Sequence, residues 1–326
     1  MGFREYVTRR FLSSLVTFFL IIILNFFIFR IMPGDPTRTI ARDARLLPEQ
    51  RELLKRRFGL DRPLWDQFVL YLVNLFKGDL GLSFQYRGTP VVEVILGRRM
   101  LNTFLLMGSS IAVALVIGMT LGTIAAWKRG SKADIAAIIF SLVTYSIPTF
   151  WMGMLLILVF GYYLDWIPLS GTITTGVEYQ SFWEYAADYL HHMVGPMITL
   201  VISFIGYHFL LMRNSLLDVF TEDYMLTAIA KGLSTRTILF KHAMRNALLP
   251  MISVMALEVV YLFSGATATE TVFTWQGLGL LIYESVVKQD YPVLQGIFIF
   301  MALAVLTANF VADVVYALID PRIRYG

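Results

Sequence analysis

The chain has no cysteine and little charge. Only 15% of its 326 residues are Asp, Glu, Lys or Arg, whereas soluble proteins carry about a quarter. Without cysteine there are no disulfides, thiolate metal sites or thiol nucleophiles. The four histidines form no H-E-x-x-H pattern, and a net charge of +4 is too small to predict nucleic-acid binding. These deficits disfavour a soluble protein, a metalloenzyme and a nucleic-acid-binding protein.

Long uncharged stretches take the place of the missing charge, because 57% of the residues are hydrophobic. About twenty apolar residues are needed to cross a bilayer as a helix. Six runs of that order are present, and a glutamate, Glu258, interrupts the fifth. The sequence therefore predicts an all-α membrane protein with six transmembrane helices, at residues 11–29, 100–127, 135–164, 189–212, 246–269 and 291–312.

The basic residues of the short loops predict the orientation, since Lys and Arg near span ends stay cytoplasmic. Lys and Arg gather before the first run, between the second and third, between the fourth and fifth, and at the end of the chain. The loop at 165–188 has neither. Both termini and the loop between runs four and five are therefore expected in the cytoplasm, and the chain is expected in the cell (inner) membrane as a multi-pass protein.

The segment at 32–99 carries twelve basic and eight acidic residues, yet the other loops place it outside. Loops beyond about 60 residues translocate largely regardless of charge. Its turn signals predict three helices: one between Pro48 and Gly59, one at 64–76, and one after Pro90. We expect a small helical subdomain outside the membrane, which separates an anchor span at 1–31 from a five-span core at 100–326.

The cytoplasmic loop at 213–247 reads as two helices that meet at an elbow. Helix-forming residues at 224–231 end at Gly232, which can adopt a left-handed conformation. Ser234 is a good N-cap for a second helix, which Pro250 is expected to limit. Such a helix across the membrane face can transmit force from a partner, or it can simply keep its charges in water.

Three other features each leave two interpretations open. Gly118-x-x-x-Gly122 suits either a dimer seam or packing within the chain. Pro148 must kink or break the third run, either as part of a gate or for structural reasons alone. Glu258 either lines a translocation path or is a neutral acid bonded to a neighbouring span.

The chain has no phosphate-binding loop, so it is not expected to hydrolyse ATP itself.

Specific segments resemble one family of transporters. Residues 227–234 and 242–250 read Thr-Ala-x-Ala-Lys-Gly-Leu-Ser and His-Ala-x-x-Asn-Ala-x-x-Pro, which is similar to the EAA loop of dipeptide/oligopeptide-type ATP-binding-cassette (ABC) importer permeases. Further matching segments lie along nearly the whole chain, at 33–36, 59–63, 78–81, 146–148, 270–273, 277–279, 290–292 and 320–322.

This resemblance implies a permease that works with a second homologous permease, two ATPase subunits that bind ATP and magnesium, and an external substrate-binding protein. The chain itself would bind no cofactor or metal and would have no catalytic residue. The cargo would be a dipeptide or oligopeptide, or a related solute such as an oligosaccharide or metal chelate. The residues that would couple the chain to an ATPase are Tyr224, Leu226, Thr227, Ala228, Ala230, Lys231, Gly232, Leu233, Ser234 and His242.

The sequence departs from the family pattern at a few positions. Leu226 stands where the general motif has Glu, and Ile229 stands where this branch commonly has Arg. Glu258 and Pro148 are the candidates for the translocation path.

Two other classes of function remain as alternatives. An ion-coupled secondary transporter would need charged residues near the midplane, and a membrane-embedded enzyme would need a polar constellation on facing spans.

Overall fold

The computed structural model describes residues 3–31, 49, 62–86 and 88–319. In these ranges the chain is helical, and the one pairing of extended backbone is an isolated bridge between Leu82 and Pro90. The all-α class predicted from the sequence is therefore confirmed for the described residues. Of the expected outer helices, the one between Pro48 and Gly59 lies outside these ranges.

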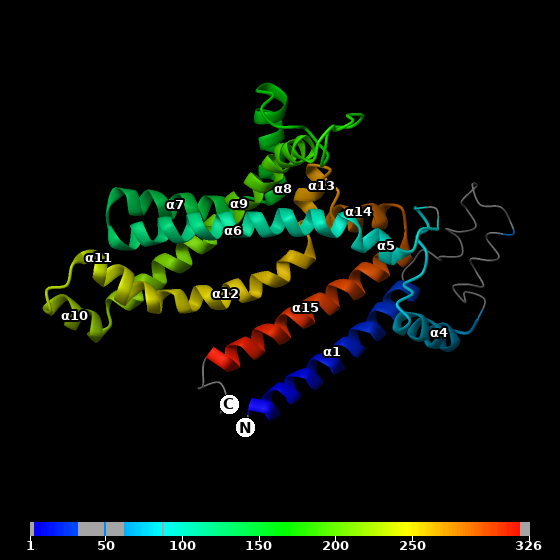
Figure 1. Ribbon diagram of the computed structural model, residues 1–326, viewed down its shortest axis with the longest axis horizontal. Coiled ribbons are helices and arrows are strands. Elements are labelled where there is room, and N and C mark those ends of the chain that lie inside the picture. Colours follow the sequence, from blue (N-terminus) through cyan, green and yellow to red (C-terminus); the bar gives the residue numbers. More distant parts are fainter. Residues whose placement is uncertain (1–2, 32–48, 50–61, 87, 320–326) are drawn as a thin grey trace. The chain divides into compact units, whose positions relative to one another are not determined.

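Figure 1 shows the helices in chain order. Their bounds are α1 Phe3–Ile31, α4 Leu64–Phe76, α5 Val91–Leu96, α6 Arg98–Trp127, α7 Lys132–Ser146, α8 Thr149–Leu156, the π-helix η1 Ile157–Tyr163, α9 Phe182–Phe220, α10 Asp223–Ala230, α11 Thr235–Thr237, the π-helix η2 Ile238–Ala243, α12 Met244–Ser264, α13 Thr267–Val272, α14 Leu278–Val287 and α15 Tyr291–Ile319. They form two compact units. Unit 1 comprises Met1–Thr103, Phe263–Thr267 and Gln276–Gly326, and unit 2 comprises Phe104–Leu262 and Ala268–Trp275.

Unit 1 is built on α1 and α15, which pack antiparallel along their length. Arg10 near the start of α1 pairs with Asp313 near the end of α15 at 3.3 Å. At the opposite end of the pair, Phe29 contacts Tyr291. The helices α5, α14 and α15 enclose a small apolar core of Val91, Ile95, Leu278, Leu281, Val293 and Ile297.

Unit 2 is organised around α9, a 39-residue helix that packs against α7 and α8. Gly206 lets α9 approach α7 so closely that a Cβ there would lie 2.6 Å from the Ser141 carbonyl oxygen. Arg213 of α9 donates two hydrogen bonds, of 2.7 and 2.8 Å, to the carboxylate of Asp134 at the start of α7. Such a bidentate pair fixes both position and orientation.

Among the described residues, five helical stretches are long and apolar enough to cross a membrane, and there are six if α7 with α8 and η1 counts as one bent span. The bend between its two parts is 99°. It falls at Pro148, where Ile147 is extended and Pro148 precedes the first turn of α8. The predicted break of the third run at Pro148 is therefore confirmed. Residues 64–76 form α4 as predicted, and α5 follows Pro90.

The structure corrects one expectation about the fifth run. Pro250 does not limit a helix, because it lies inside α12. A proline is tolerated in a membrane helix where neighbouring groups satisfy the freed backbone carbonyl, and Pro196 sits inside α9 in the same way. The apolar run to residue 269 is broken at Gly265, as that glycine predicts: α12 ends at Ser264, and Gly265 has a φ of +73°. This left-handed residue turns the chain into α13.

The glycines of α6 decide between the two interpretations of the Gly118-x-x-x-Gly122 motif. A Cβ at Gly118 would lie 2.6 Å from the Cβ of His208, and one at Gly122 would lie 2.7 Å from the Phe209 carbonyl oxygen. Both glycines thus face α9 of the same chain. Small residues allow this close approach of two backbones, so the motif serves packing within the chain.

We expect Gly118→Ala and Gly122→Ala to destabilise unit 2 by about 1–3 kcal/mol, the usual cost of overpacking. Gly108→Ala is the matched control on the same helix, because its Cβ would lie at an ordinary 3.8 Å from Leu262. All three changes raise helix propensity alike, so the difference between them reports packing alone. Thermal unfolding in detergent measures it. Equal melting temperatures for the three variants would contradict the close approach.

Candidate functional site

The segment at 223–243, here called the elbow, forms two short helical pieces around one glycine. The first piece is α10, and Gly232 after it has a φ of +69°. The Ser234 hydroxyl accepts a hydrogen bond of 3.3 Å from the Thr237 N–H and caps the second piece, which continues through η2 into α12. The predicted elbow at Gly232 and the cap at Ser234 are therefore confirmed.

One face of α10 fixes the elbow to the spans. Met225 and Ala228 are buried on this face. They share an apolar cluster with Met212 and Leu216 of α9 and with residues of η2 and α12. The Tyr224 hydroxyl also accepts a 2.6 Å hydrogen bond from the Asn246 side chain on α12. A force on α10 would therefore reach both α9 and α12.

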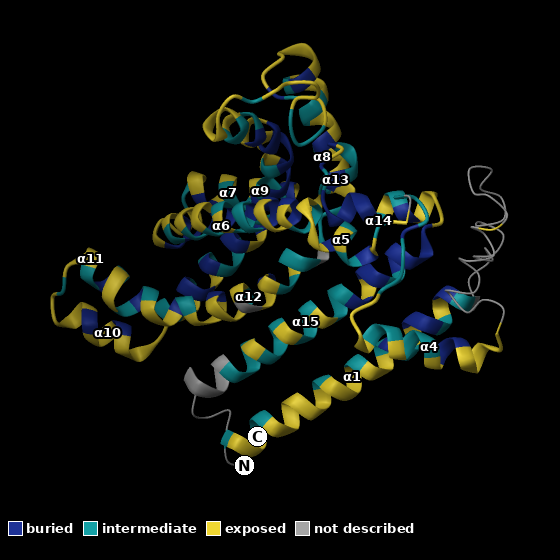
Figure 2. Cartoon of the chain, turned by 45° about the vertical axis from the view of Figure 1, so that its right-hand side comes forward, coloured by how far each residue is buried: buried dark blue, intermediate teal, exposed yellow. Residues whose placement is uncertain are grey.

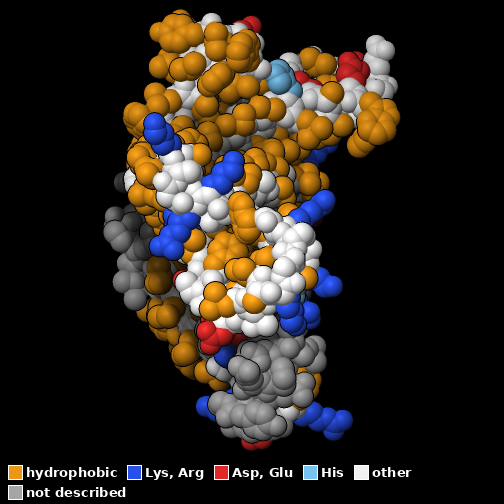
Figure 3. Space-filling view, turned by 90° about the vertical axis from the view of Figure 1, so that its left-hand side faces the viewer, with side chains coloured by type: hydrophobic (Ala, Val, Ile, Leu, Met, Phe, Trp, Pro, Cys, Tyr) orange, Lys and Arg blue, Asp and Glu red, His pale blue; other side chains and the backbone are white. Residues whose placement is uncertain are grey.

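The other face of α10 is exposed and apolar. Leu226 is 62% exposed and Ile229 is 57% exposed, and Phe240 of η2 is 60% exposed. Figure 3 views the end of the molecule that carries α10 and α11, where Lys and Arg side chains stand among hydrophobic ones. The exposed basic residues here are Lys231, Arg236 and Lys241 of the elbow and Arg245 at the start of α12.

Most of the coupling residues predicted from the sequence lie on the surface of the elbow. Ala228 is buried, and Leu233 and His242 are half-buried. Leu233 packs against the apolar cluster beneath α10. The exposed ones are Tyr224, Leu226, Thr227, Ala230, Lys231, Gly232 and Ser234. The predicted coupling residues thus lie in one short segment, where most are exposed and where Ala228 and Leu233 pack against the apolar cluster.

Glu258 of α12 lies against a histidine of α9 that the sequence did not single out. The Glu258 carboxylate is 3.4 Å from Nε2 of His208, and both residues are buried. Oε2 of Glu258 and both ring nitrogens of His208 have no hydrogen-bond partner among the described residues. Buried polar atoms without partners are costly, so this pair is an incompletely satisfied polar contact within unit 2. Pro148, the other path candidate, is exposed.

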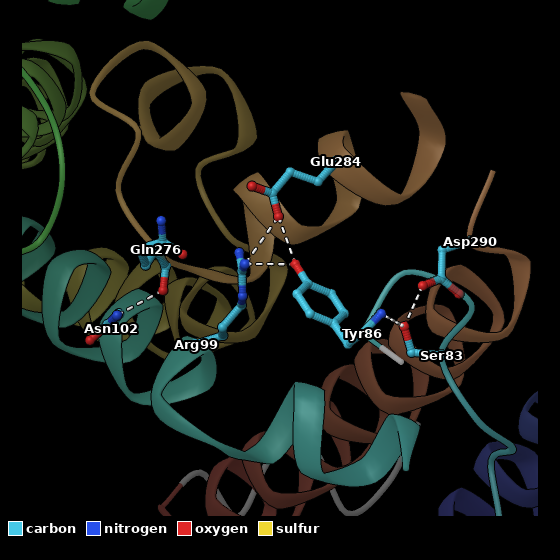
Figure 4. A network of polar contacts seen from close by, with 7 residues as sticks. All are labelled: Ser83, Tyr86, Arg99, Asn102, Gln276, Glu284 and Asp290. Atoms are coloured by element: carbon cyan, nitrogen blue, oxygen red, sulfur yellow. Dashed lines mark hydrogen bonds and ion pairs between the residues drawn. The ribbon is translucent and has the colours of Figure 1, made fainter. Parts of the chain in front are cut away.

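In unit 1, the buried carboxylate of Asp290 organises the loop before α5 (Figure 4). It accepts hydrogen bonds from the Ser83 hydroxyl at 2.5 Å and from the N–H groups of Phe84 and Gln85 at 3.2 and 3.0 Å. The Ser83 oxygen in turn accepts from the Tyr86 N–H at 2.9 Å. Several donors around one carboxylate compensate its burial, and the loop is thereby fixed to the start of α15.

A second cluster, on the same loop, joins α6 to α14 (Figure 4). Arg99 forms a 3.0 Å ion pair with Glu284, and the Tyr86 hydroxyl donates a 2.9 Å hydrogen bond to the same carboxylate oxygen. Burial raises the pKa of Tyr86 to about 12, and its bond to Glu284 acts in the same direction. The hydroxyl therefore stays protonated at neutral pH and remains a donor. Arg99 also donates to the Tyr86 oxygen at 2.8 Å.

Sequence reasoning missed these polar clusters because their members are far apart in the chain. Asp290 belongs to one of the segments that resemble the family, and this could have marked it as a residue of interest. Nothing in the sequence near His208 indicates its contact with Glu258, and nothing near Asp134 indicates its contact with Arg213. Among the described residues, no three His, Asp or Glu side chains lie close enough together to hold a metal ion. The candidate functional features described here are therefore the surface of the elbow and the buried polar clusters.

Comparison with known proteins assigns the family. The model of the binding-protein-dependent transport system inner membrane component matches residues 118–325, and the model of the N-terminal part of such membrane components matches residues 3–104. The chain belongs to this family. It is a permease subunit of a binding-protein-dependent importer and a multi-pass protein of the inner membrane, and the alternative of an ion-coupled secondary transporter is set aside.

Individual permeases are similar to the chain over nearly its whole length. The oligopeptide transport system permease protein AppB of Bacillus subtilis is 37% identical over 98% of this chain and 99% of AppB. The di/tripeptide permease DppB of Pseudomonas aeruginosa is 36% identical, again over 98% of this chain and 99% of its own length. The glutathione permease GsiC of Escherichia coli K12 is 38% identical with the same coverage.

Proposed function

We propose that this permease carries dipeptides or oligopeptides, and that it forms the translocation path together with a second homologous permease. The three relatives named above transport oligopeptides, di- and tripeptides, and glutathione. Their cargoes are all short peptides, which supports a peptide cargo here over an oligosaccharide or a metal chelate. An external substrate-binding protein would deliver the peptide, and two ATPase subunits would drive the cycle.

The elbow is the proposed contact with an ATPase subunit, and the observation that carries this proposal is the two-sided character of α10. Its buried face joins α9 and α12, and its exposed face offers Leu226 and Ile229. Leu226 stands where the general motif has Glu, and Ile229 where this branch commonly has Arg, so the contact would be apolar at these two positions. Closure of the ATPases would then move α10 and switch the spans between outward-open and inward-open states.

In this arrangement ATP and magnesium belong to the ATPase subunits, and the permease binds no cofactor. Both chain termini and the elbow would lie in the cytoplasm, and the segment at 32–99 would lie outside. The loop fixed by Asp290 and the cluster around Glu284 would then form a rigid outer surface against which the binding protein docks. Rigid docking surfaces lose less entropy on binding.

The sharpest test of the coupling role is Gly232→Val in the assembled transporter. A Cβ at Gly232 meets nothing within 4 Å, so any effect comes from its φ of +69°. A side chain in this conformation costs about 1–2 kcal/mol, which lowers the population of the native elbow about tenfold. We expect uptake and substrate-stimulated ATPase activity to fall while the ATPase still co-purifies.

Gly232→Asn is the matched control, since Asn tolerates the left-handed conformation better than a β-branched residue. This variant should retain most of the uptake. Normal uptake and ATPase stimulation in Gly232→Val would contradict the coupling role of the elbow. Failure of any ATPase to co-purify with the wild-type chain would contradict the proposed assembly.

Glu258 is the proposed recognition point for the amino terminus of a peptide in the path. Under this proposal Glu258→Gln should lower uptake of a peptide with a free amino group relative to its N-acetylated form, with assembly and basal ATPase activity preserved. His208→Gln is the control, because it removes the neighbour at 3.4 Å and keeps the carboxylate. If both cargoes change equally, or neither changes, Glu258 has a structural role in contact with α9.

The proposed orientation can be tested by thiol labelling, because the chain has no cysteine of its own. Cysteines introduced at Gln50 and at Thr175 should react with an impermeant thiol reagent in intact cells. One introduced at Arg236 should react only after the membrane is opened. Labelling of position 236 in intact cells would overturn the orientation.

A further inference from the structure

The helix α4 carries an exposed apolar stripe that no part of unit 1 covers among the described residues. The stripe consists of Trp65, Val69, Val73 and Phe76, which are 68%, 44%, 44% and 74% exposed. Their spacing of four, four and three residues places them on one side of the helix. Gln67 and Phe68 of the same helix are buried, and Figure 2 shows both exposed and buried residues on α4. The exposed side of the helix is therefore largely apolar, with the exposed Asp66 at its edge, and the buried side carries Gln67 beside Phe68.

The buried side attaches α4 to the end of α1. The ring of Phe68 lies 5.1 Å from that of Phe26 and 6.0 Å from that of Phe27. The Asn25 side chain donates a 3.5 Å hydrogen bond to the Tyr71 hydroxyl and a 3.0 Å bond to a backbone carbonyl of α15. The position of α4 along α1 is thus set by contacts at residues 25–27.

These contacts give the depth of α4 in the bilayer. The uncharged stretch of α1 at 11–29 rises about 29 Å as a helix, which matches a hydrocarbon core of about 30 Å. Residues 25–27 lie two to four positions before its end, roughly 3–6 Å inside the boundary with the headgroups. At this level α1 itself exposes Leu24 and Ile28, so both helices expose apolar side chains here.

The ends of α4 have the chemistry of a helix that lies in the membrane interface. Trp65 stands near one end, and tryptophan is favoured at the boundary between acyl chains and headgroups. The exposed basic residues Arg62 and Lys77 flank the helix. Basic side chains beside an apolar face are attracted to lipid phosphates.

We propose that α4 is an interfacial helix whose stripe is inserted among the acyl chains of the bilayer, with Arg62 and Lys77 directed to the phosphates of phospholipid headgroups. The occupant of the stripe is the lipid. This inference does not depend on the cargo or on the proposed coupling role. Its mechanical consequence is that α4 holds the end of α1, and the loop that follows α4, at a constant depth while other spans move.

Spin labels can test this in the assembled transporter reconstituted in bilayers of phosphatidylethanolamine and phosphatidylglycerol. Single cysteines at Val69→Cys and Val73→Cys carry the label, and collision with oxygen is compared with collision with a water-soluble nickel complex. Leu24→Cys on α1 serves as the lipid reference, and Thr175→Cys in an exposed loop serves as the water reference. We expect positions 69 and 73 to match Leu24→Cys, with high oxygen and low nickel accessibility.

Nickel accessibility as high as that of Thr175→Cys would mean that the stripe faces water, and low accessibility to both reagents would mean that protein covers it. Either result overturns the proposal. A label-free measurement gives a second readout, because brominated lipids quench a tryptophan among acyl chains. Quenching of the whole transporter should decrease in Trp65→Phe, and an unchanged degree of quenching would equally overturn the proposal.

Discussion

The absence of water from the bilayer core is the constraint on which the rest of this structure depends. Every backbone N–H and C=O within the membrane needs a partner inside the protein, so the spans are helices. Where the helices are interrupted, the sequence supplies a residue that allows the break, as at Pro148 and at Gly265. Apolar attraction between helices is also weak in lipid, so the spans associate by close contact. Gly118, Gly122 and Gly206 provide that contact along α9.

The same constraint explains how the elbow combines attachment with accessibility. The helix α10 has eight residues, too few to be stable alone in water. It persists because Met225 and Ala228 complete an apolar cluster with α9 and α12. Leu226 and Ile229 are then left on the outside. An exposed apolar face on a helix anchored to the spans suits a partner that pushes on it, which is why the coupling proposal rests on this helix.

The buried polar side chains of this structure differ in how completely their hydrogen bonds are satisfied. Asp134 and Asp290 are buried with their hydrogen bonds made, by Arg213 in one case and by a hydroxyl and backbone N–H groups in the other. Such clusters hold the ends of helices in place. Glu258 and His208 are buried with hydrogen-bonding atoms left over. A polar pair that is not fully satisfied costs free energy. A cargo group, or a change of conformation, that supplied the missing hydrogen bonds would recover that free energy.

The sequence by itself determined the helical class, the apolar runs, the break at Pro148 and the elbow at Gly232, because each of these is set by local chemistry. Hydrophobic length, a missing backbone N–H and a left-handed glycine act within a few residues. The continuation of α12 through Pro250 was misjudged, since neighbouring spans decide whether a proline interrupts a membrane helix. Only the tertiary structure decided that Glu258 meets His208, that Asp290 holds the loop before α5, and that the glycines of α6 face α9. Those contacts join residues up to 207 positions apart, and the approach of distant helices leaves no mark in the local pattern of a single sequence.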